Sequence, residues 1–303
     1  MDPAYKKAYL LYHVCVFLWG FTAVFGKVID LTETMLVWYR MGITTLVLLF
    51  LPAVWKHLHA LNRKTIFQLF GIGILVAMHW IAFYGSIKAA NISVALTTLA
   101  TTSIFVSIGE PLLFKRKFIW HELALGILVV PAMYLIFTFS GEYTKGIILG
   151  LISTVFATAF SLLNKKMIAK AHPLHITGIE IGSGFLVLTC VLPFYIHAHP
   201  DIALSPSGMD TIYLLIFAVV CTVLPFTLSL YSLRHISVFT ASITLNLEPV
   251  YGIAMAIFFF HENKSLHPGF YVGTLIILAI VFLDPFIRRK FGQMRIPPYV
   301  PGE

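Results

Sequence analysis

The second half of this sequence repeats the first, and the length of the repeat restricts the fold more than any other feature. Tyr231 follows Tyr84 by 147 positions within a similar apolar contour, and the triplet Ile92–Val94 returns 144 positions later as Ile236–Val238. If each copy holds five membrane spans, the second copy must enter the bilayer from the opposite side. Inverted repeats of this kind are typical of secondary transporters, whose binding site lies near the membrane midplane between the copies.

Composition places nearly the whole chain in a bilayer. Hydrophobic residues make up 59% of the 303 positions and charged residues 11%, against about 25% charged in soluble domains. Apolar stretches of about 20 residues, the length that spans a membrane as a helix, occur ten times: 8–28, 33–53, 66–87, 91–114, 119–138, 146–164, 174–196, 210–233, 237–260 and 267–286. We therefore predict an all-α membrane protein with ten transmembrane helices in two inverted five-helix repeats. The repeats are predicted at 1–142 and 143–290, followed by a cytoplasmic tail at 291–303.

The basic residues are distributed so as to orient the chain. The formal net charge of +8 could indicate a nucleic-acid partner, but of the 21 Lys and Arg residues only four fall on one side of the ten-span arrangement: Lys27, Lys88, Lys145 and Lys264. Arg40 lies inside a span, and the remaining basic residues fall on the other side. An excess of Lys and Arg marks the cytoplasmic side. We expect no nucleic-acid partner, a multi-pass protein of the inner (cytoplasmic) membrane, and both termini in the cytoplasm.

The sequence carries no pattern that predicts an enzyme. The pairs His57/His59 and His172/His175 lack the spacing of a metal site, and no two aspartates lie deep in spans as an intramembrane aspartyl protease requires. We expect no metal, no cofactor and no enzymatic activity; a membrane-embedded enzyme or a sensor is the less favoured alternative. The cysteines show no pairing or metal-ligand spacing and are predicted to be small core residues: Cys15, Cys190 and Cys221.

A carboxylate lies deep in the ninth span, where ionisable groups are costly and often functional. Glu248 precedes Pro249, which removes a backbone donor and frees a carbonyl one turn earlier. The carboxylate could bind a proton or a cationic part of a cargo, or it could bond to a neighbouring helix and hold the kink. Asn246 and Ser242 lie four residues apart on one face of the same helix, which suits cavity lining or interhelical bonding.

The fourth span carries a cluster of hydroxyl side chains. Thr97 with Thr101, and Thr98 with Thr102, form stripes with i, i+4 spacing that could line a polar path. Threonine hydroxyls also bond back to their own helix, so a structural role is the alternative. We take Thr97 and Thr101 as candidate contacts to a substrate.

Histidine and tryptophan side chains lie deep in the third and first spans. His79 is followed by Trp80, and Phe83 lies four residues after His79 on the same side. A histidine beside aromatic rings could contact an aromatic or zwitterionic solute or carry a proton, although a lone histidine is more often a packing residue. Trp19 in the first span has the same two interpretations.

Two further charged residues occupy aligned positions in the repeat. Glu180 in the seventh span follows Arg40 in the second by 140 positions. Inverted repeats place the two near opposite faces, so we do not expect them to pair. We favour local structural bonds for both, with Glu180 as a candidate proton site beside Glu248.

Four stretches carry a resemblance to a known family. They are LWGFTAVFGK (18–27), WYRMG (38–42), YSLRHISVFTAS (231–242) and LNLEPVYGIAMAIFFFHENKS (245–265). Their order, together with the repeat, resembles the drug/metabolite transporter superfamily and specifically its EamA-type exporters. Members often carry proline within the fourth span. Here 102–105 lie opposite Pro249, so we expect the first half to bend differently.

The resemblance implies a central cavity lined by helices one, three, four, six, eight and nine, with helices two, five, seven and ten outside it. It also implies a secondary transporter that exports a small organic solute of the amino-acid, metabolite or drug class by alternating access. Proton coupling and uncoupled bidirectional facilitation are both open. The expected partners are the solute and the lipid bilayer. We place the substrate site near the midplane, with these candidate contacts: Trp19, His79, Thr97, Thr101, Asn246 and Glu248.

Overall fold

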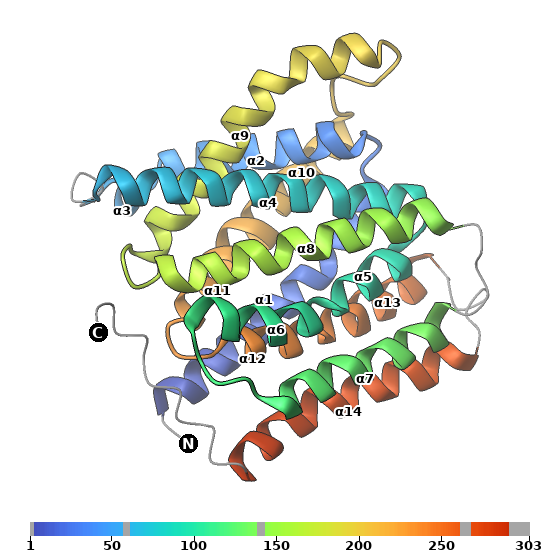
Figure 1. Ribbon diagram of the computed structural model, residues 1–303. Coiled ribbons are helices and arrows are strands. Elements are labelled where there is room, and N and C mark those ends of the chain that lie inside the picture. Colours follow the sequence, from blue (N-terminus) through green and yellow to red (C-terminus); the bar gives the residue numbers. More distant parts are fainter. Residues whose placement is uncertain (1–2, 57–60, 138–142, 261–267, 291–303) are drawn as a thin grey trace.

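The computed structural model of the chain is helical throughout its described secondary structure, and it describes residues 3–56, 61–137, 143–260 and 268–290 (Figure 1). The predicted tail at 291–303 lies outside the described residues. In the first half the helices are α1 (Pro3–Val28), α2 (Glu33–Leu49), α3 (Pro52–Trp55), α4 (Arg63–Ala89), α5 (Ile92–Ala100), α6 (Thr102–Phe114) and α7 (Trp120–Phe137). In the second half they are α8 (Thr144–Met167), α9 (Pro173–Ala198), α10 (Gly208–Ala218), the π-helix η3 (Val219–Val223), α11 (Leu224–Ser232), α12 (Val238–Leu245), α13 (Leu247–Phe260) and α14 (Pro268–Lys290).

Seven segments among the described residues are long and apolar enough to cross a membrane. They are α1, α4, α5 with α6, α8, α9, α10 to α11, and α12 with α13. The three other predicted spans coincide with α2, which has 17 residues, with α7 and with α14. Large apolar side chains cover the outside of the bundle; Phe50 is 83% exposed and Phe194 75%. An apolar exterior of this kind suits contact with lipid rather than water.

Helices that correspond in the two halves pack against each other in opposite directions. α7 and α14 run side by side along one edge of the bundle (Figure 1). The N-terminal helix of the fourth span, α5, contacts the C-terminal helix of the ninth, α13, while α6 contacts α12. This crossed pattern requires the fourth and ninth spans to be antiparallel. α2 packs against its counterpart α9 on the other side of the molecule.

The fourth and ninth spans both break at the middle, at corresponding positions. Thr101 interrupts α5 and α6 with φ −68° and ψ −7°, and Asn246 ends α12 with φ −62° and ψ −9°. The expectation that the first half bends differently is therefore wrong at this point. In the second half Pro249 lacks the N–H that would continue the helix. In the first half the hydroxyls of Thr98, Thr101 and Thr102 donate to carbonyls three residues earlier, and such back-bonding bends helices.

Glycines allow the closest helix contacts. A Cβ atom on Gly150 of α8 would lie 2.0 Å from the hydroxyl oxygen of Thr98 in α5, and one on Gly73 of α4 would lie 2.2 Å from the carbonyl oxygen of Glu180 in α9. Small residues at such crossings let helix backbones approach in a bilayer. Gly182, in contrast, has no atom nearer than 3.8 Å to its ideal Cβ position.

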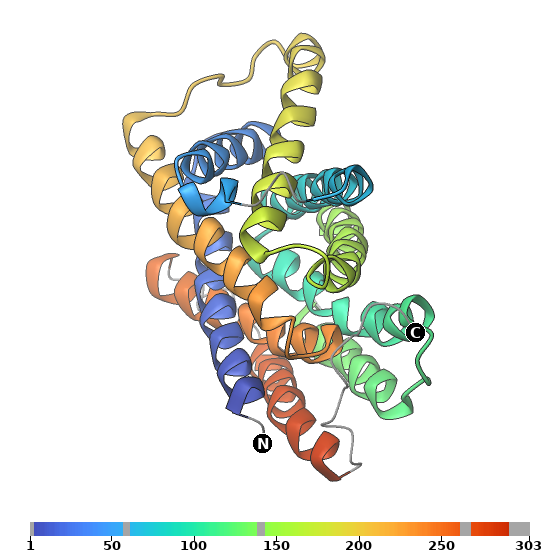
Figure 2. The same ribbon diagram turned by 90° about the vertical axis from the view of Figure 1, so that its left-hand side faces the viewer.

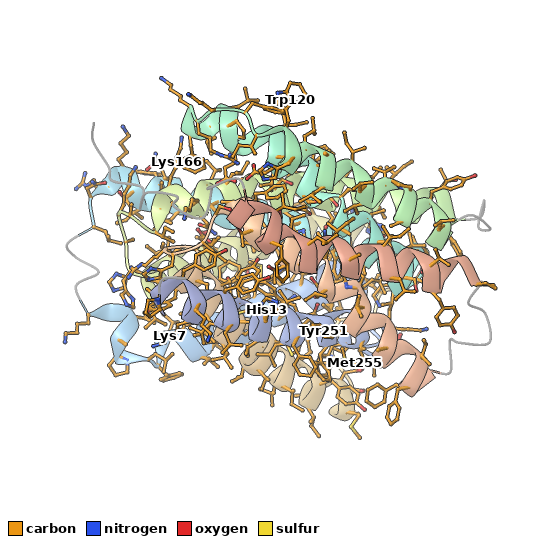
Figure 3. The ribbon with its side chains drawn as sticks, turned by 90° about the horizontal axis from the view of Figure 1, so that it is seen from below. Lys7, His13, Trp120, Lys166, Tyr251 and Met255 are labelled. Atoms are coloured by element: carbon orange, nitrogen blue, oxygen red, sulfur yellow. The ribbon has the colours of Figure 1, made fainter. Side chains whose placement is uncertain are left out.

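Polar contacts tie the helices together at both ends of the bundle. At the basic end, where Lys7 and Lys166 lie (Figure 3), Arg116 bridges Glu110 at 3.2 Å and Glu122 at 2.5 Å. Glu110 also accepts a hydrogen bond from the backbone N–H of Phe239 at the start of α12, at 3.1 Å, which joins the two halves.

At the other end the backbone N–H of Asp30 donates to Asp210 at 3.3 Å, and the hydroxyl of Ser86 donates to the carbonyl of Gly146 at 2.7 Å. Both contacts join the first half to the second.

The cysteines differ in environment. Cys15 and Cys221 are buried, as predicted, but Cys190 is exposed on the outer surface of α9, so its prediction as a core residue is wrong. All three are free thiols. Apolar periodicity could not place Cys190, because a lipid-facing side of a helix is as apolar as a packed one.

Candidate functional site

A cavity of about 90 Å³ lies at the centre of the bundle, between the two halves. At about 30 Å³ for each water, a space of this size holds roughly three water molecules, which is less than a drug-sized solute needs. The first half lines it with Tyr12, Trp19, Thr22, Arg40, His79, Trp80, Phe83, Tyr84, Leu99 and Thr102. The second half lines it with Ala157, Phe160, Ser161, Asn164, Phe226, Ser229, Leu230, Leu233, Leu245 and Glu248.

Arg40 is the one permanent cation in this lining, and it reaches the cavity from α2. Its guanidinium donates to the Tyr84 hydroxyl at 2.6 Å, to the Thr222 hydroxyl at 2.8 Å and to the Cys221 carbonyl at 3.5 Å. The side chain is 2% exposed, and no carboxylate among the described residues lies within ion-pair distance of it. Its charge is thus held by neutral groups and lacks an ion-pair partner.

Aromatic rings enclose the same guanidinium. The central carbon of Arg40 lies 3.7 Å from the ring centre of Trp80 and 4.1 Å from that of Phe217. Stacking between two faces is favourable for a planar cation, because the electron-rich face of an aromatic ring attracts it. The rings also fix the plane of the guanidinium, so its N–H groups point in fixed directions.

The eighth span supplies acceptors for Arg40 because its helix is irregular there. The hydroxyl of Thr222 donates to the carbonyl of Phe217, five residues earlier, within the π-helical segment η3. Pro225 follows and has no N–H, so the carbonyl of Cys221 one turn earlier is free to accept from Arg40. π-helical turns inside longer helices are frequent at functional sites.

Glu248 faces the same cavity from the ninth span. It lies in the first turn of α13, directly after the break at Asn246, and is 4% exposed. The structure gives its carboxylate no hydrogen-bond or ion-pair partner among the described residues. The cavity therefore contains a cation without an ion pair and a carboxylate without a donor, and a solute with both acceptor and donor groups could satisfy them.

The aromatic candidates from the first half lie in the cavity wall. Trp19 lines it and packs edge-on against Tyr12, with ring centres 6.0 Å apart. His79 also lines it, and its Nδ1 contacts both the hydroxyl of Ser153, at 2.8 Å, and the carbonyl of the same residue, at 3.0 Å. His79 thus combines a structural bond to α8 with a face turned toward the cavity.

The other polar candidates lie away from the cavity. Thr97 donates to the carbonyl of Ser93 at 2.5 Å, and Thr101 donates to that of Thr98 at 2.6 Å; the lining described above includes neither. Asn246 is 1% exposed, and both polar atoms of its amide lack a partner among the described residues. It is placed at the helix break, behind the wall that Leu245 and Glu248 form.

A second buried carboxyl group does not line the cavity itself but contacts a residue that does. Glu180 in α9 is 0% exposed, and its Oε2 accepts from Nδ2 of Asn164 in α8 at 3.1 Å. Its Oε1 and the Oδ1 of Asn164 both lack a partner among the described residues. Asn164 itself lines the cavity, so its amide connects Glu180 to the space where a solute would bind.

The cavity also has polar and aromatic lining residues that were not among the predicted substrate contacts, including Arg40, Trp80 and Asn164. The expectation that the second helix lies outside the cavity is wrong for Arg40, because its long side chain extends inward between α4 and η3. The available signal was the alignment of Arg40 with Glu180 in the repeat, since both members of that pair adjoin the cavity. As expected, the two do not pair with each other. No cluster of His, Cys, Asp or Glu suited to a metal ion occurs in the described ranges.

Comparison with known proteins decides the family. The EamA-like transporter family is matched twice along the chain, over residues 6–138 and 144–283. The chain belongs to the EamA-like transporter family. It is a multi-pass membrane protein of duplicated halves, and its family is one of transporters rather than of enzymes.

Two further likenesses agree with this assignment. An uncharacterised transporter of Archaeoglobus fulgidus is 25% identical over 215 residues, covering 71% of this chain and 75% of the relative. A crystal structure of another protein has the same fold, with a TM-score of 0.70 at 12% identity over 93% of this chain and 99% of that one. At this identity the second likeness concerns the fold alone.

Proposed function

We propose that this EamA-family protein is a secondary transporter that exports a small organic solute through the central cavity by alternating access. The observation that carries the proposal is the central cavity between the halves, with Arg40 and Glu248 both facing it. Buried charges without partners are costly in a bilayer. The buried charges of Arg40 and Glu248 are explained if a cargo binds to both groups during each transport cycle.

The proposed architecture is ten spans in two inverted five-helix halves, residues 1–142 and 143–290, followed by a cytoplasmic tail at 291–303. The antiparallel pairs α7/α14 and α5–α6/α12–α13 support it, because counterparts that run in opposite directions are what inverted repeats produce. Both ends of the bundle are tied in the structure, and the cavity is small. We propose that alternating access requires these contacts to break at one end at a time, which would enlarge the cavity for a solute.

The proposed cargo has an apolar body and a polar end. Solutes of the amino-acid, metabolite and drug classes all fit this description. Arg40 would donate to an anionic or accepting group, and Glu248 would accept from a donor or cation. Trp19, His79 and Trp80 supply aromatic faces. Thr97 and Thr101 are assigned to the helix break instead, and Asn246 to the same break in the other half.

We propose coupling to protons, with Glu180 as the proton carrier. An ionised carboxylate with one neutral donor and no cation would be strongly disfavoured at this depth. A protonated Glu180 can donate from Oε1 to the unpartnered Oδ1 of Asn164 while it accepts from Nδ2. A donor group on the cargo competes for the same Oδ1, so cargo and proton exclude each other, as antiport requires. Glu248 is the alternative proton site, and uncoupled facilitation is the alternative mechanism.

The transport proposal predicts that the cavity aromatics are needed for binding. A thermal-shift screen of the purified protein against amino acids, nucleosides, organic acids and organic cations should identify a cargo that raises apparent stability. With that cargo, Trp19→Ala should weaken binding about tenfold, on the order of 1.4 kcal/mol, by calorimetry. Trp120→Ala is the matched control, because Trp120 is 76% exposed on α7. Equal affinities in Trp19→Ala and wild type would place the site elsewhere.

The proposed orientation predicts labelling from defined sides. On a background without Cys15, Cys190 and Cys221, Phe118→Cys should react with an impermeant thiol reagent only after the cytoplasmic side is opened. Asp201→Cys should react from outside. Both positions are exposed, so accessibility reports sidedness. Strong labelling of Phe118→Cys in intact cells would reverse the topology and make inward transport the default direction.

A further inference from the structure

The structure contains a second hollow, outside the transport cavity, at the basic end of the bundle. It measures about 560 Å³ and lies between α3, the turn joining α8 to α9, and the residues that follow α11. Figure 2 faces this end and has the three segments next to one another. The first half contributes α3, and the second half contributes the other two, so the hollow spans the boundary between the halves.

Among the described residues that line this hollow, every titratable side chain is basic. The five basic groups come from three separate segments: Lys56, Lys170, His172, His175 and Arg234. The N-terminus of α9, a helix of 26 residues, adds the positive end of its dipole at the same place. The acidic residues Glu110 and Glu122 at this end of the bundle are already bridged by Arg116.

The contacts within the hollow fix these groups without neutralising them. Nε2 of His175 contacts the carbonyl of Lys56 at 2.7 Å, and Arg234 donates from Nη2 to the carbonyl of Ala171 at 3.5 Å. The Nε of Arg234 is buried and has no partner among the described residues. Nδ1 of His172 accepts from the backbone N–H of Leu174 at 3.3 Å. Burial, together with the neighbouring Arg234 and His175, lowers the pKa of His172, so the positive charge of the hollow comes mainly from Lys56, Lys170 and Arg234.

Part of the lining is aliphatic, from Leu61, Ile168 and Leu174. Ala53 also lines the hollow and follows Phe50 by three residues, and Phe50 is 83% exposed on the surface that we assign to lipid. Basic pockets between transmembrane helices on the cytoplasmic side are suited to phosphorylated lipid headgroups, and a partly aliphatic lining close in the chain to a lipid-facing residue matches a headgroup with its acyl chains better than a free ion.

Orientation of the chain alone does not account for this arrangement. The positive-inside rule requires basic residues somewhere in the cytoplasmic loops, and Arg63 and Lys64 satisfy it from outside the hollow. It does not require five basic groups from three segments to converge on one concave surface. We propose that this hollow binds the phosphate group of an acidic phospholipid headgroup and that the bound lipid contacts both halves of the transporter.

Native mass spectrometry of the full-length protein tests the proposal with defined lipids. The protein is released from detergent after incubation with phosphatidylglycerol or with zwitterionic phosphatidylcholine. We expect at least fivefold more phosphatidylglycerol than phosphatidylcholine to be retained. Arg234→Ala should remove most of this preference, and Lys170→Ala, at a more exposed position, provides a second variant if the first does not fold. Arg63→Ala is the matched control and should retain the preference.

The remaining outcomes separate the possible sources of the phosphate. Equal retention of the two lipids, or equal loss of phosphatidylglycerol in Arg63→Ala and Arg234→Ala, would overturn the proposal in favour of a general charge effect. Stabilisation by inorganic phosphate without lipid retention would overturn the assignment to a lipid. None of these readouts depends on transport or on the cargo, so failure here leaves the proposed transport function untouched.

Discussion

Replacement of Arg40 by methionine is expected to weaken solute binding strongly while the folded protein keeps most of its stability. A hydrogen bond to a charged group contributes about 1.5–3 kcal/mol, so loss of the guanidinium should weaken cargo binding roughly tenfold to hundredfold. Replacing a buried charge by an apolar side chain of similar volume is often neutral or stabilising, even where the charge had a partner. The measurement is calorimetric binding beside thermal unfolding.

The groups that Arg40 leaves behind retain other bonds, which is why stability should survive. The Thr222 hydroxyl still donates to the Phe217 carbonyl at 2.9 Å, and the Tyr84 hydroxyl has Thr22 as a second partner. Arg40→Lys keeps the charge but loses the planar guanidinium, which stacks between Trp80 and Phe217 and donates in fixed directions. We expect it to bind weakly as well. Wild-type affinity in Arg40→Met, with a folded protein, would exclude Arg40 from the site.

The membrane class and the helical fold could be predicted from the sequence, since both follow from long apolar runs and a repeat. The family followed from the resemblance of four stretches to its members. The depth of a residue in the membrane could also be predicted. Trp19, His79 and Glu248 lie in the middle of predicted spans, and all three line the cavity. Position along a span is set by residue count, because each residue adds a fixed rise. The rotation of a helix about its own axis depends on which neighbours it meets.

The errors in the predicted site come from that rotation. Thr97 and Thr101 have the spacing of a cavity-lining face, yet both hydroxyls bond back to carbonyls of their own helix, while Thr102 of the neighbouring stripe lines the cavity. Periodicity in a bilayer does not distinguish a cavity from a helix contact, because both accept small polar residues. Arg40 was missed for a related reason. Its acceptors depend on the π-helical segment η3, which has no signature that single-sequence periodicity reveals.

Glu180→Gln is expected to abolish accumulation driven by a pH gradient while exchange of cargo across the membrane continues. Glutamine has the same shape and keeps an oxygen that accepts from Asn164, but it carries no proton. Accumulation of the identified cargo in liposomes with an imposed pH gradient should therefore fall to the level seen without a gradient. Glu248→Gln is the comparison, and it should weaken binding in both assays because Glu248 faces the cargo.

A spectroscopic measurement separates the protonation of Glu180 from any assay of transport. Infrared spectra of the reconstituted protein should contain a carbonyl band of a protonated carboxylic acid that is absent in Glu180→Gln and present in Glu248→Gln. Asn164→Leu should move that band to higher frequency, because the acid loses the acceptor for its proton. If Glu180→Gln leaves the band in place, Glu180 is not the proton carrier. If instead Glu248→Gln removes it and gradient-driven accumulation disappears with it, the coupling site is the carboxylate in the cavity itself, and proton and cargo compete there directly.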